Sequence, residues 1–260
     1  MCRFSAWVGE ERPLSTLLYD APHALEVQAY RPREMLSGHV NVDGTGVAWW
    51  HGGDPEPLRY VSERPPWSDA NLPHLARRLR GAPILAAVRS QTPGMPAGEG
   101  AVHPFAHEHW AGAHNGYIQG FRQIGGELIG RIEPDLRGAL DLVSDARVLF
   151  LLMVGAVRGG ASLADALRHA AAAAVEVGER SGHAVSLNLV LADAGTVAAL
   201  RLARGVAANT LYTIEGADGW PAGCAVASEP LDSDAAWLAV PDEHLVVLDS
   251  GGVRLERAAL

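Results

Sequence analysis

The chain has 260 residues, of which 48% are hydrophobic and 20% charged, and its formal net charge is −9 at pH 7. This charge argues against nucleic acid or an anionic membrane as a partner, because both bind to basic surfaces. The longest apolar run, residues 148–157, is about half of a bilayer span, and two cysteines without a signal peptide indicate a reduced, cytoplasmic protein.

The first third of the chain alternates short apolar runs with turn residues. This pattern predicts strands at residues 4–8, 47–50 and 83–88. Short helical segments are predicted at residues 15–20, 23–30 and 72–79. Loops are predicted in the segments rich in Pro, Gly or Ser, at residues 55–69 and 91–100.

Two helices are predicted in the centre of the chain. The first covers residues 144–158, with Ser144 as the N-cap and Asp145 at the positive end of the helix. The second is rich in alanine, covers residues 162–177 and ends before Gly178.

The last third of the chain reads as strands, at residues 184–191, 196–202, 210–214, 224–228 and 244–248. No internal repeat and no polar linker divides the chain. Two sheets packed face to face, with helices outside them, would account for this order of elements. We therefore expect one domain.

The second residue is a cysteine, and a residue this small allows the initiator Met1 to be removed. Cys2 would then carry a thiol and a free α-amine, whose reference pKa values are about 8.5 and about 7.7–8.0. At neutral pH part of the amine is unprotonated and can take the thiol proton, directly or through one water. The alternative is a small apolar side chain buried in the first strand.

Arg89 stands where the apolar run of residues 83–88 emerges into a loop rich in Gly and Pro. A planar guanidinium in this place can bind a carboxylate through two parallel hydrogen bonds. The alternative is an ordinary surface arginine at the end of a strand.

The dipeptide Asn115-Gly116 is predicted to form a turn between residues 110–114 and 117–118, because Asn-Gly is the strongest short signal for a hairpin. A carboxamide N–H and a glycine N–H held close together can also stabilise the oxygen of a tetrahedral intermediate. A plain turn and an oxyanion hole are therefore both compatible with this dipeptide.

Asp145 could accept a substrate ammonium, although complementarity to the helix dipole explains an Asp at a helix start equally well. His103, His107 and His109 lie close in sequence, and the last two would share one face of a strand. No Cys or carboxylate set completes a tetrahedral zinc site, and no phosphate-binding loop is present. We expect no metal and no cofactor.

Several short segments, taken in chain order, form a set that resembles the class II glutamine amidotransferases, which are N-terminal nucleophile hydrolases. The segments are Met1-Cys2-Arg3, 41–46 (NVDGTG), Val88-Arg89, 114–116 (HNG), Ser144-Asp145, 186–188 (SLN) and 227–231 (ASEPL). They extend over roughly the whole chain.

The resemblance implies an α+β fold of four layers, αββα, with two packed and largely antiparallel sheets between helical layers. Residues 2–260 would form a single domain of this type after the removal of Met1. Cys2 would be the nucleophile and its own amine the base. Asn115 and Gly116 would form the oxyanion hole.

Within this family the chain is most similar to the ergothioneine-pathway amidohydrolases, through residues 1–3, 27–33, 41–44, 89–94 and 227–231. That resemblance implies cleavage of a small-molecule γ-glutamyl substrate, γ-glutamyl-hercynylcysteine sulfoxide, with release of glutamate. Arg89 would bind the glutamyl α-carboxylate, assisted by Thr92, and Asp145 the α-ammonium. His114 would be a further substrate-binding residue.

The chain departs from the family at Thr45, where an aromatic residue is usual, and this change is expected to reshape the edge of the pocket. The amidotransferase-like fold accounts for the whole length and leaves no residues for an ammonia-accepting domain, which favours hydrolysis. Two alternatives stay open: a glutaminase subunit that delivers ammonia to a partner synthase, and an inactive amidotransferase-like binding module. The leaving amine and the oligomeric state, a homo-oligomer included, are not determined by the sequence.

Overall fold

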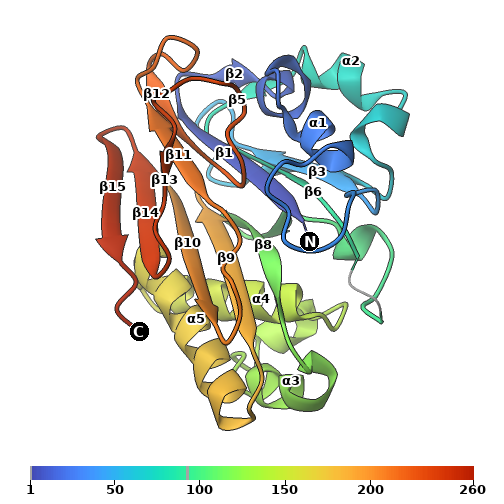
Figure 1. The fold of residues 1–260 in the computed structure, drawn as a ribbon, viewed down its shortest axis with the longest axis vertical. Helices are drawn as coiled ribbons and strands as arrows, with labels where there is room; N and C mark the ends of the chain where they lie inside the picture. The colour runs from blue at the N-terminus through green and yellow to red at the C-terminus, as the bar shows by residue number, and fades with distance from the viewer. Residues whose placement is uncertain (1, 92–93) are drawn as a thin grey trace.

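The computed structural model describes residues 2–91 and 94–260 and contains two antiparallel sheets packed face to face (Figure 1). The first has seven strands, in the spatial order β13 (Leu238–Ala239), β11 (Tyr212–Glu215), β12 (Gly223–Ala227), β1 (Arg3–Gly9), β6 (Ile84–Val88), β3 (Thr45–Trp49) and β4 (Leu58–Ser62). The second has six, in the order β15 (Gly252–Arg257), β14 (His244–Asp249), β10 (Val197–Arg204), β9 (Val185–Ala192), β8 (Trp110–Ile118) and β7 (Phe105–His107). A separate pair is formed by β2 (Arg12–Pro13) and β5 (Arg80–Gly81).

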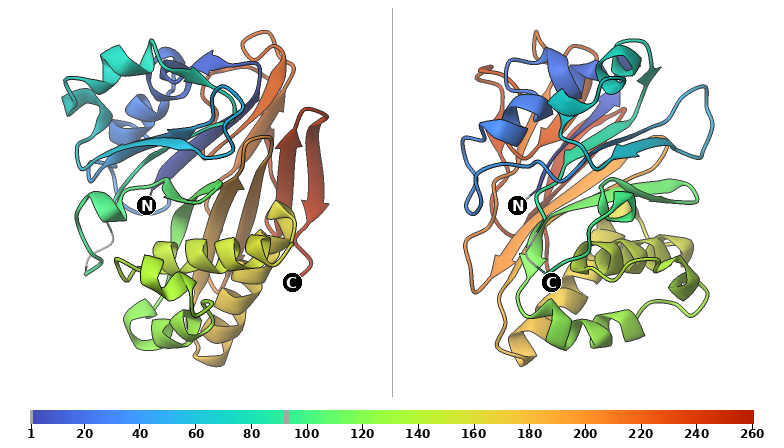
Figure 2. Two further views of the ribbon diagram at one scale, coloured as in Figure 1. Left: turned by 180° about the vertical axis from the view of Figure 1, so that it is seen from behind. Right: turned by 90° about the vertical axis from the view of Figure 1, so that its right-hand side faces the viewer.

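Helical layers cover the outer face of each sheet (Figure 2). Over the seven-stranded sheet lie η1 (Thr16–Asp20), α1 (Leu25–Tyr30), η2 (Pro66–Ser68) and α2 (Leu72–Ala76). Over the six-stranded sheet lie α3 (Phe121–Gly130), η4 (Leu136–Ala139), α4 (Asp145–Arg158) and α5 (Leu163–Arg180), and η3 (Glu99–Ala101) precedes β7. The predicted αββα layers are confirmed. In the described part of the chain, none of the helices has the length and apolarity needed to span a bilayer.

The central strand β1 is buried on both faces. Phe4, Ala6 and Val8 pack against the six-stranded sheet, whereas Trp7 packs with Leu25 of α1 on the opposite face. Because successive side chains of a strand point to opposite faces, residue 2 shares the inter-sheet face with Phe4. The alternation of side chains along β1 thus directs the side chain of Cys2, the residue before this strand, into the layer between the sheets.

The two long helices begin at the predicted caps. Ser144 Oγ accepts a hydrogen bond from Arg147 N over 3.1 Å, and Ser162 Oγ accepts one from Asp165 N over 3.1 Å. The predicted end of the second helix before Gly178 is wrong, because α5 continues to Arg180. A Cβ on Gly178 would lie 2.9 Å from a carbonyl oxygen, so this glycine allows close packing and does not end the helix.

The predicted turn at Asn115-Gly116 is also wrong, because β8 passes straight through both residues. Asn115 stands opposite Asn188 of β9, and Gly116 stands opposite Leu187. A Cβ on Gly116 would lie 1.9 Å from the carbonyl oxygen of Ser186. The glycine is therefore required by a close approach between neighbouring strands.

The strands predicted at residues 4–8, 47–50 and 83–88 correspond to β1, β3 and β6, and those predicted in the last third correspond to β9, β10, β11, β12 and β14. The predicted loop at residues 55–69 is wrong in part, because it contains the half-exposed edge strand β4 and η2.

The helix α3 was not predicted, since Gly125 and Gly126 lower the helix propensity of its centre. His107 and His109 do not share a strand face, because Glu108 adopts a positive φ of 50° in the turn between β7 and β8.

A buried carboxylate holds the start of β1 in place. Glu229, fully buried just after β12, accepts hydrogen bonds from Arg3 Nε over 3.0 Å and from His23 Nε2 over 2.8 Å. The backbone N–H groups of Arg33 and Glu34 donate to the same carboxylate over 2.8 and 3.1 Å. Burial opposes ionisation, but these hydrogen bonds and the Arg3 charge outweigh it and lower the pKa of Glu229 to about 2.

The depressed pKa of Glu229 predicts a specific loss of stability in acid. A carboxyl with a lower pKa in the folded than in the unfolded state stabilises the fold above the unfolded pKa of about 4.3, and this contribution disappears as the pH falls towards 2. The expected loss is about 3 kcal/mol between pH 5 and pH 2. Urea unfolding over this range measures it.

The matching variant is Glu229→Gln, which we expect to be less stable at neutral pH by roughly 3–5 kcal/mol, because Arg3 loses its buried partner. Its unfolding free energy should also change less steeply with pH below 5. The exposed Glu176→Gln serves as the control and should follow the unmodified protein. A Glu229→Gln curve parallel to that of the unmodified protein would contradict the argument.

Candidate active site

The candidate nucleophile and the candidate carboxylate-binding arginine lie side by side because their strands are paired. Arg3 of β1 stands opposite Val88 of β6, so Cys2 and Arg89 meet at the same end of the seven-stranded sheet. This end lies beside β8 of the second sheet, where the N-terminus is marked in Figure 1. A narrow cavity of about 40 Å³ opens there, lined by Cys2, Arg89, Ser90, Met95, Ala101, His103, His114, Gly116, Ser144, Asp145 and Ala146.

The Cys2 thiol is half-buried and hydrogen-bonds to the carbonyl oxygen of Ser90, with a distance of 3.8 Å from Sγ to O. Burial raises the pKa of the Cys2 thiol, although the charge of Arg89 opposes the shift. The thiol is therefore protonated at neutral pH. It needs a base before it can act as a nucleophile.

Arg89 is a buried cation whose side chain is held by a backbone group. It is 7% exposed, and its Nη2 donates to the carbonyl oxygen of Pro96 over 2.6 Å. Within residues 2–91 and 94–260 no carboxylate lies close enough to form an ion pair with its guanidinium. A buried charge without an internal counterion beside a cavity is suited to bind an anionic group from outside.

The backbone of β8 directs one N–H group towards the cavity. Gln119 N donates to Ala184 O over 2.9 Å, so odd-numbered residues of β8 point their N–H groups at β9 and even-numbered residues point theirs away. Ile118 N accordingly donates to Asp145 Oδ2 over 3.0 Å. Gly116, two residues earlier, lines the cavity. Its N–H points to the same side and can serve as an oxyanion donor.

The side chain of Asn115 lies outside that cavity lining, in the layer between the sheets. It is fully buried, and its Nδ2 is 3.5 Å from Ser228 Oγ. The structure therefore brings Gly116 to the cavity lining, whereas the Asn115 side chain is not part of that lining. The oxyanion role of both residues stays a prediction.

Asp145 and His114 line the cavity from α4 and β8. The Asp145 carboxylate accepts the N–H groups of Ile118 and Ala146, over 3.0 and 2.8 Å, and so ties the start of α4 to β8. Burial lowers the pKa of His114. Its Nε2 lies 3.1 Å from Ser186 O, so Nε2 carries the donated hydrogen and Nδ1 is left as an acceptor.

Two further positions were singled out from the sequence. Thr92 falls outside the described residues. Thr45 is fully buried in β3, donates to Arg64 O over 2.8 Å and does not belong to the cavity lining, so the effect of the missing aromatic ring on the pocket edge stays a prediction.

Among the lining residues that sequence reasoning did not assign to the site is His103, which it considered for metal binding alone. Burial lowers the pKa of His103 well below its usual value, so the ring is neutral, and its buried Nδ1 has no hydrogen-bond partner within the described residues. The same residues contain no group of three or more His, Cys, Asp or Glu that could hold a metal. A neutral imidazole in this position can add a hydrogen-bonding group to the cavity wall.

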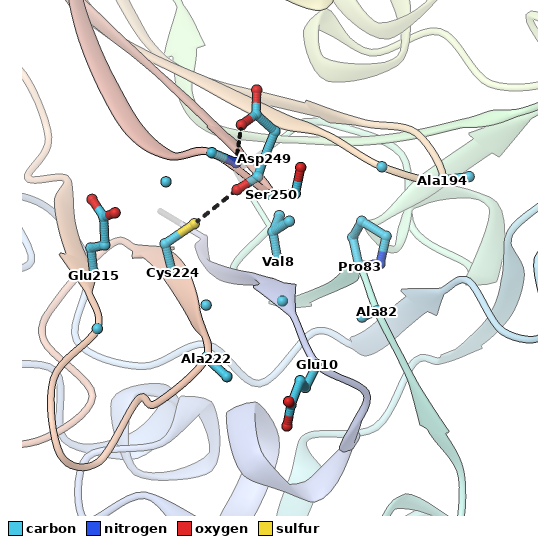
Figure 3. Close-up of a pocket in the computed structure, with 16 residues that line it drawn as sticks. Val8, Glu10, Ala82, Pro83, Ala194, Glu215, Ala222, Cys224, Asp249 and Ser250 are labelled. Atoms are coloured by element: carbon cyan, nitrogen blue, oxygen red, sulfur yellow. Dashed lines mark hydrogen bonds between the residues drawn. The ribbon is translucent and has the colours of Figure 1, made fainter.

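A larger cavity, of about 740 Å³, lies at the opposite end of β1 around Cys224 (Figure 3). The Cys224 thiol donates to Asp249 O with Sγ 3.9 Å away, and burial raises its pKa to about 12. Its charged neighbours Glu10, Glu215 and Asp249 are acidic and would further disfavour a thiolate. The smaller cavity around Cys2 is therefore the better candidate for nucleophilic chemistry.

The chain is similar to known proteins over nearly its whole length. The family model of class II glutamine amidotransferases matches residues 19–208. The γ-glutamyl-hercynylcysteine sulfoxide hydrolase of Mycobacterium tuberculosis is 35% identical over 255 residues, which cover 98% of this chain and 96% of that protein. The enzyme of the same name from Mycolicibacterium smegmatis is 36% identical over 248 residues, 95% of each chain. A class II glutamine aminotransferase domain protein of Silicibacter pomeroyi has the same fold, with a TM-score of 0.73 at 24% identity over 98% of this chain and 99% of its own.

The two thiols are expected to differ in reactivity. Iodoacetamide should alkylate Cys2 in the folded protein and leave Cys224 unmodified, because Cys2 is partly exposed whereas Cys224 is fully buried. Peptide mass mapping after a short pulse measures both sites. In urea, as the control, both thiols should react. Equal labelling of the two cysteines in the folded protein would contradict the choice of Cys2 as the reactive thiol.

Proposed function

The chain belongs to the class II glutamine amidotransferases and is an amidohydrolase, and on this premise we propose that it hydrolyses the γ-glutamyl amide bond of γ-glutamyl-hercynylcysteine sulfoxide and releases glutamate. The observation that supports this choice of substrate is the 35% identity, over 98% of the chain, to a hydrolase named for that compound. The two free cysteines fit a reduced cytoplasmic compartment. Residues 2–260 would act as one domain.

The nucleophile is the Cys2 thiol after removal of Met1. Its own α-amine takes the thiol proton, and Sγ attacks the γ-carbonyl carbon of the substrate. The tetrahedral intermediate collapses when the C–N bond breaks, and the leaving amine receives the proton from the terminal ammonium. Water then attacks the γ-glutamyl thioester, with the amine again accepting a proton, and releases glutamate and the free thiol.

The cavity residues are assigned to the two charged groups of the glutamyl moiety. Arg89, a buried cation with no ion pair in the described part of the chain, binds the α-carboxylate, with Thr92 assisting. Asp145 binds the α-ammonium, and the acceptor nitrogen of His114 adds a further contact. Gly116 N–H and the Asn115 carboxamide stabilise the oxyanion, each contributing about 3–4 kcal/mol in the transition state.

The first test compares two substrates. We expect glutamate release from γ-glutamyl-hercynylcysteine sulfoxide to be much faster than from glutamine, and Cys2→Ala to lose turnover completely while keeping its fold, because no thioester can form. Cys224→Ala is the matched control and should retain activity. Intact mass should show that Met1 is absent from the active protein.

Other outcomes of the same test favour the alternatives. Equal turnover of glutamine that rises when a synthase is added would favour an ammonia-delivering subunit. An absence of glutamate from either substrate, with Met1 removed, would favour a binding module. Substantial activity in Cys2→Ala would refute the mechanism.

A second test concerns the carboxylate clamp. Arg89→Lys keeps the charge but loses the planar fork, so we expect KM to rise on the order of 10- to 100-fold with a smaller change in kcat. Steady-state kinetics on the γ-glutamyl substrate measures both constants. Arg131→Lys, in an exposed ion pair, is the control and should leave both unchanged. An unaltered KM in Arg89→Lys would remove Arg89 from the binding site.

A further inference from the structure

Ser228 directly follows β12 and hydrogen-bonds to β1, the strand that begins just after Cys2. Its backbone N donates to Phe4 O over 2.9 Å, and its side-chain Oγ accepts the Phe4 N–H over 3.0 Å. The carbonyl oxygen of Ser228, which would accept that N–H in a regular ladder, accepts the hydroxyl of Thr210 instead, over 2.8 Å. The Ser228 hydroxyl thus replaces a backbone acceptor two residues from Cys2.

The same hydroxyl reaches across to the second sheet. Ser228 Oγ lies 3.5 Å from Asn115 Nδ2, and both side chains are fully buried. A single oxygen atom therefore touches the strand of the nucleophile and the side chain assigned to the oxyanion hole. It connects two parts of the site that different sheets carry.

The Asn115 backbone is held independently of this contact. Asn115 pairs with Asn188 in the β8–β9 ladder, and its carbonyl oxygen also accepts Asn209 Nδ2 over 3.2 Å. Its carboxamide has far less support: the Oδ1 atom is buried without a partner, and within the described residues Ser228 Oγ is the one hydrogen-bond partner of the group. The hydrogen bond to Ser228 Oγ is therefore what restricts rotation about the Cβ–Cγ bond of Asn115.

We propose that Ser228 is a positioning residue that holds the Asn115 carboxamide in the orientation required for the oxyanion. This rests on the proposed function. Ser228 Oγ accepts one Nδ2 hydrogen and thereby fixes the plane of the carboxamide, so that the second Nδ2 hydrogen is left for the oxyanion. A fixed N–H donor raises kcat without strengthening ground-state binding, because it acts on charge that develops in the transition state.

The test is Ser228→Ala, measured with whichever γ-glutamyl amide the unmodified enzyme hydrolyses. We expect kcat to fall by roughly 10- to 100-fold, with KM and the rate of Cys2 alkylation by iodoacetamide changed less than about twofold. Ser5→Ala is the matched control: Ser5 is also buried, lies opposite Ala227 on the same strand pair and has no hydrogen-bond partner for its hydroxyl among the described residues. Its kcat should be unchanged.

A double-mutant comparison separates positioning from a general structural effect. In an Asn115→Ala background the Ser228→Ala change should cost no further kcat, because the group that Ser228 orients is absent. Three results would overturn the role of Ser228 and leave the proposed function intact. They are additive losses of kcat in the double variant, an unchanged kcat in Ser228→Ala, and a rate of Cys2 alkylation that falls in parallel with kcat. An unmodified enzyme that hydrolyses no γ-glutamyl amide would overturn both.

Discussion

The buried ion pair between Arg3 and Glu229 is the constraint on which the geometry of this site depends. Both side chains are inaccessible to solvent, and Arg3 Nη1 also donates to the carbonyl oxygen of Cys2 over 3.1 Å. A strand end otherwise frays, because its last residues have few partners. Here the Glu229 carboxylate connects β1 to His23, just before α1, and to Arg33, just after it. Residue 2, which precedes β1, therefore has a defined position.

Polar side chains of the candidate site lie at one end of the layer between the sheets, because side chains alternate between the two faces along each strand. Phe4, Ala111 and Val226 belong to the apolar inter-sheet core. At the end of the same layer the apolar positions give way to Cys2, Asn115 and Ser228, which continue the alternation of β1, β8 and β12. The two sheets pack through apolar residues over most of their contact and meet through polar ones at the site. This arrangement places the proposed nucleophile and the proposed oxyanion donors on rigid elements.

Sequence patterns were most reliable where a single local rule decides the structure. The Ser144 cap and the apolar alternation of β1 and β9 are local, and the structure contains them. Asn115-Gly116 and Gly178 were misread, because each glycine serves a neighbouring strand that lies far away in sequence. His103 and Ser228 carry no local signal at all. Their importance arises from side chains that meet them across the fold.

The sequence by itself determined the order of the strands and helices, which follows from periodicity and turn residues, and the family, which follows from the short motifs taken in chain order. Only the tertiary structure decided which residues line the cavity, that the Asn115 side chain is outside this lining, and that the Glu229 carboxylate and the Ser228 hydroxyl hold the N-terminal strand. The physical reason is that these are contacts between strands of different sheets or between residues more than one hundred positions apart. Such contacts depend on register and packing, which no single stretch of sequence specifies.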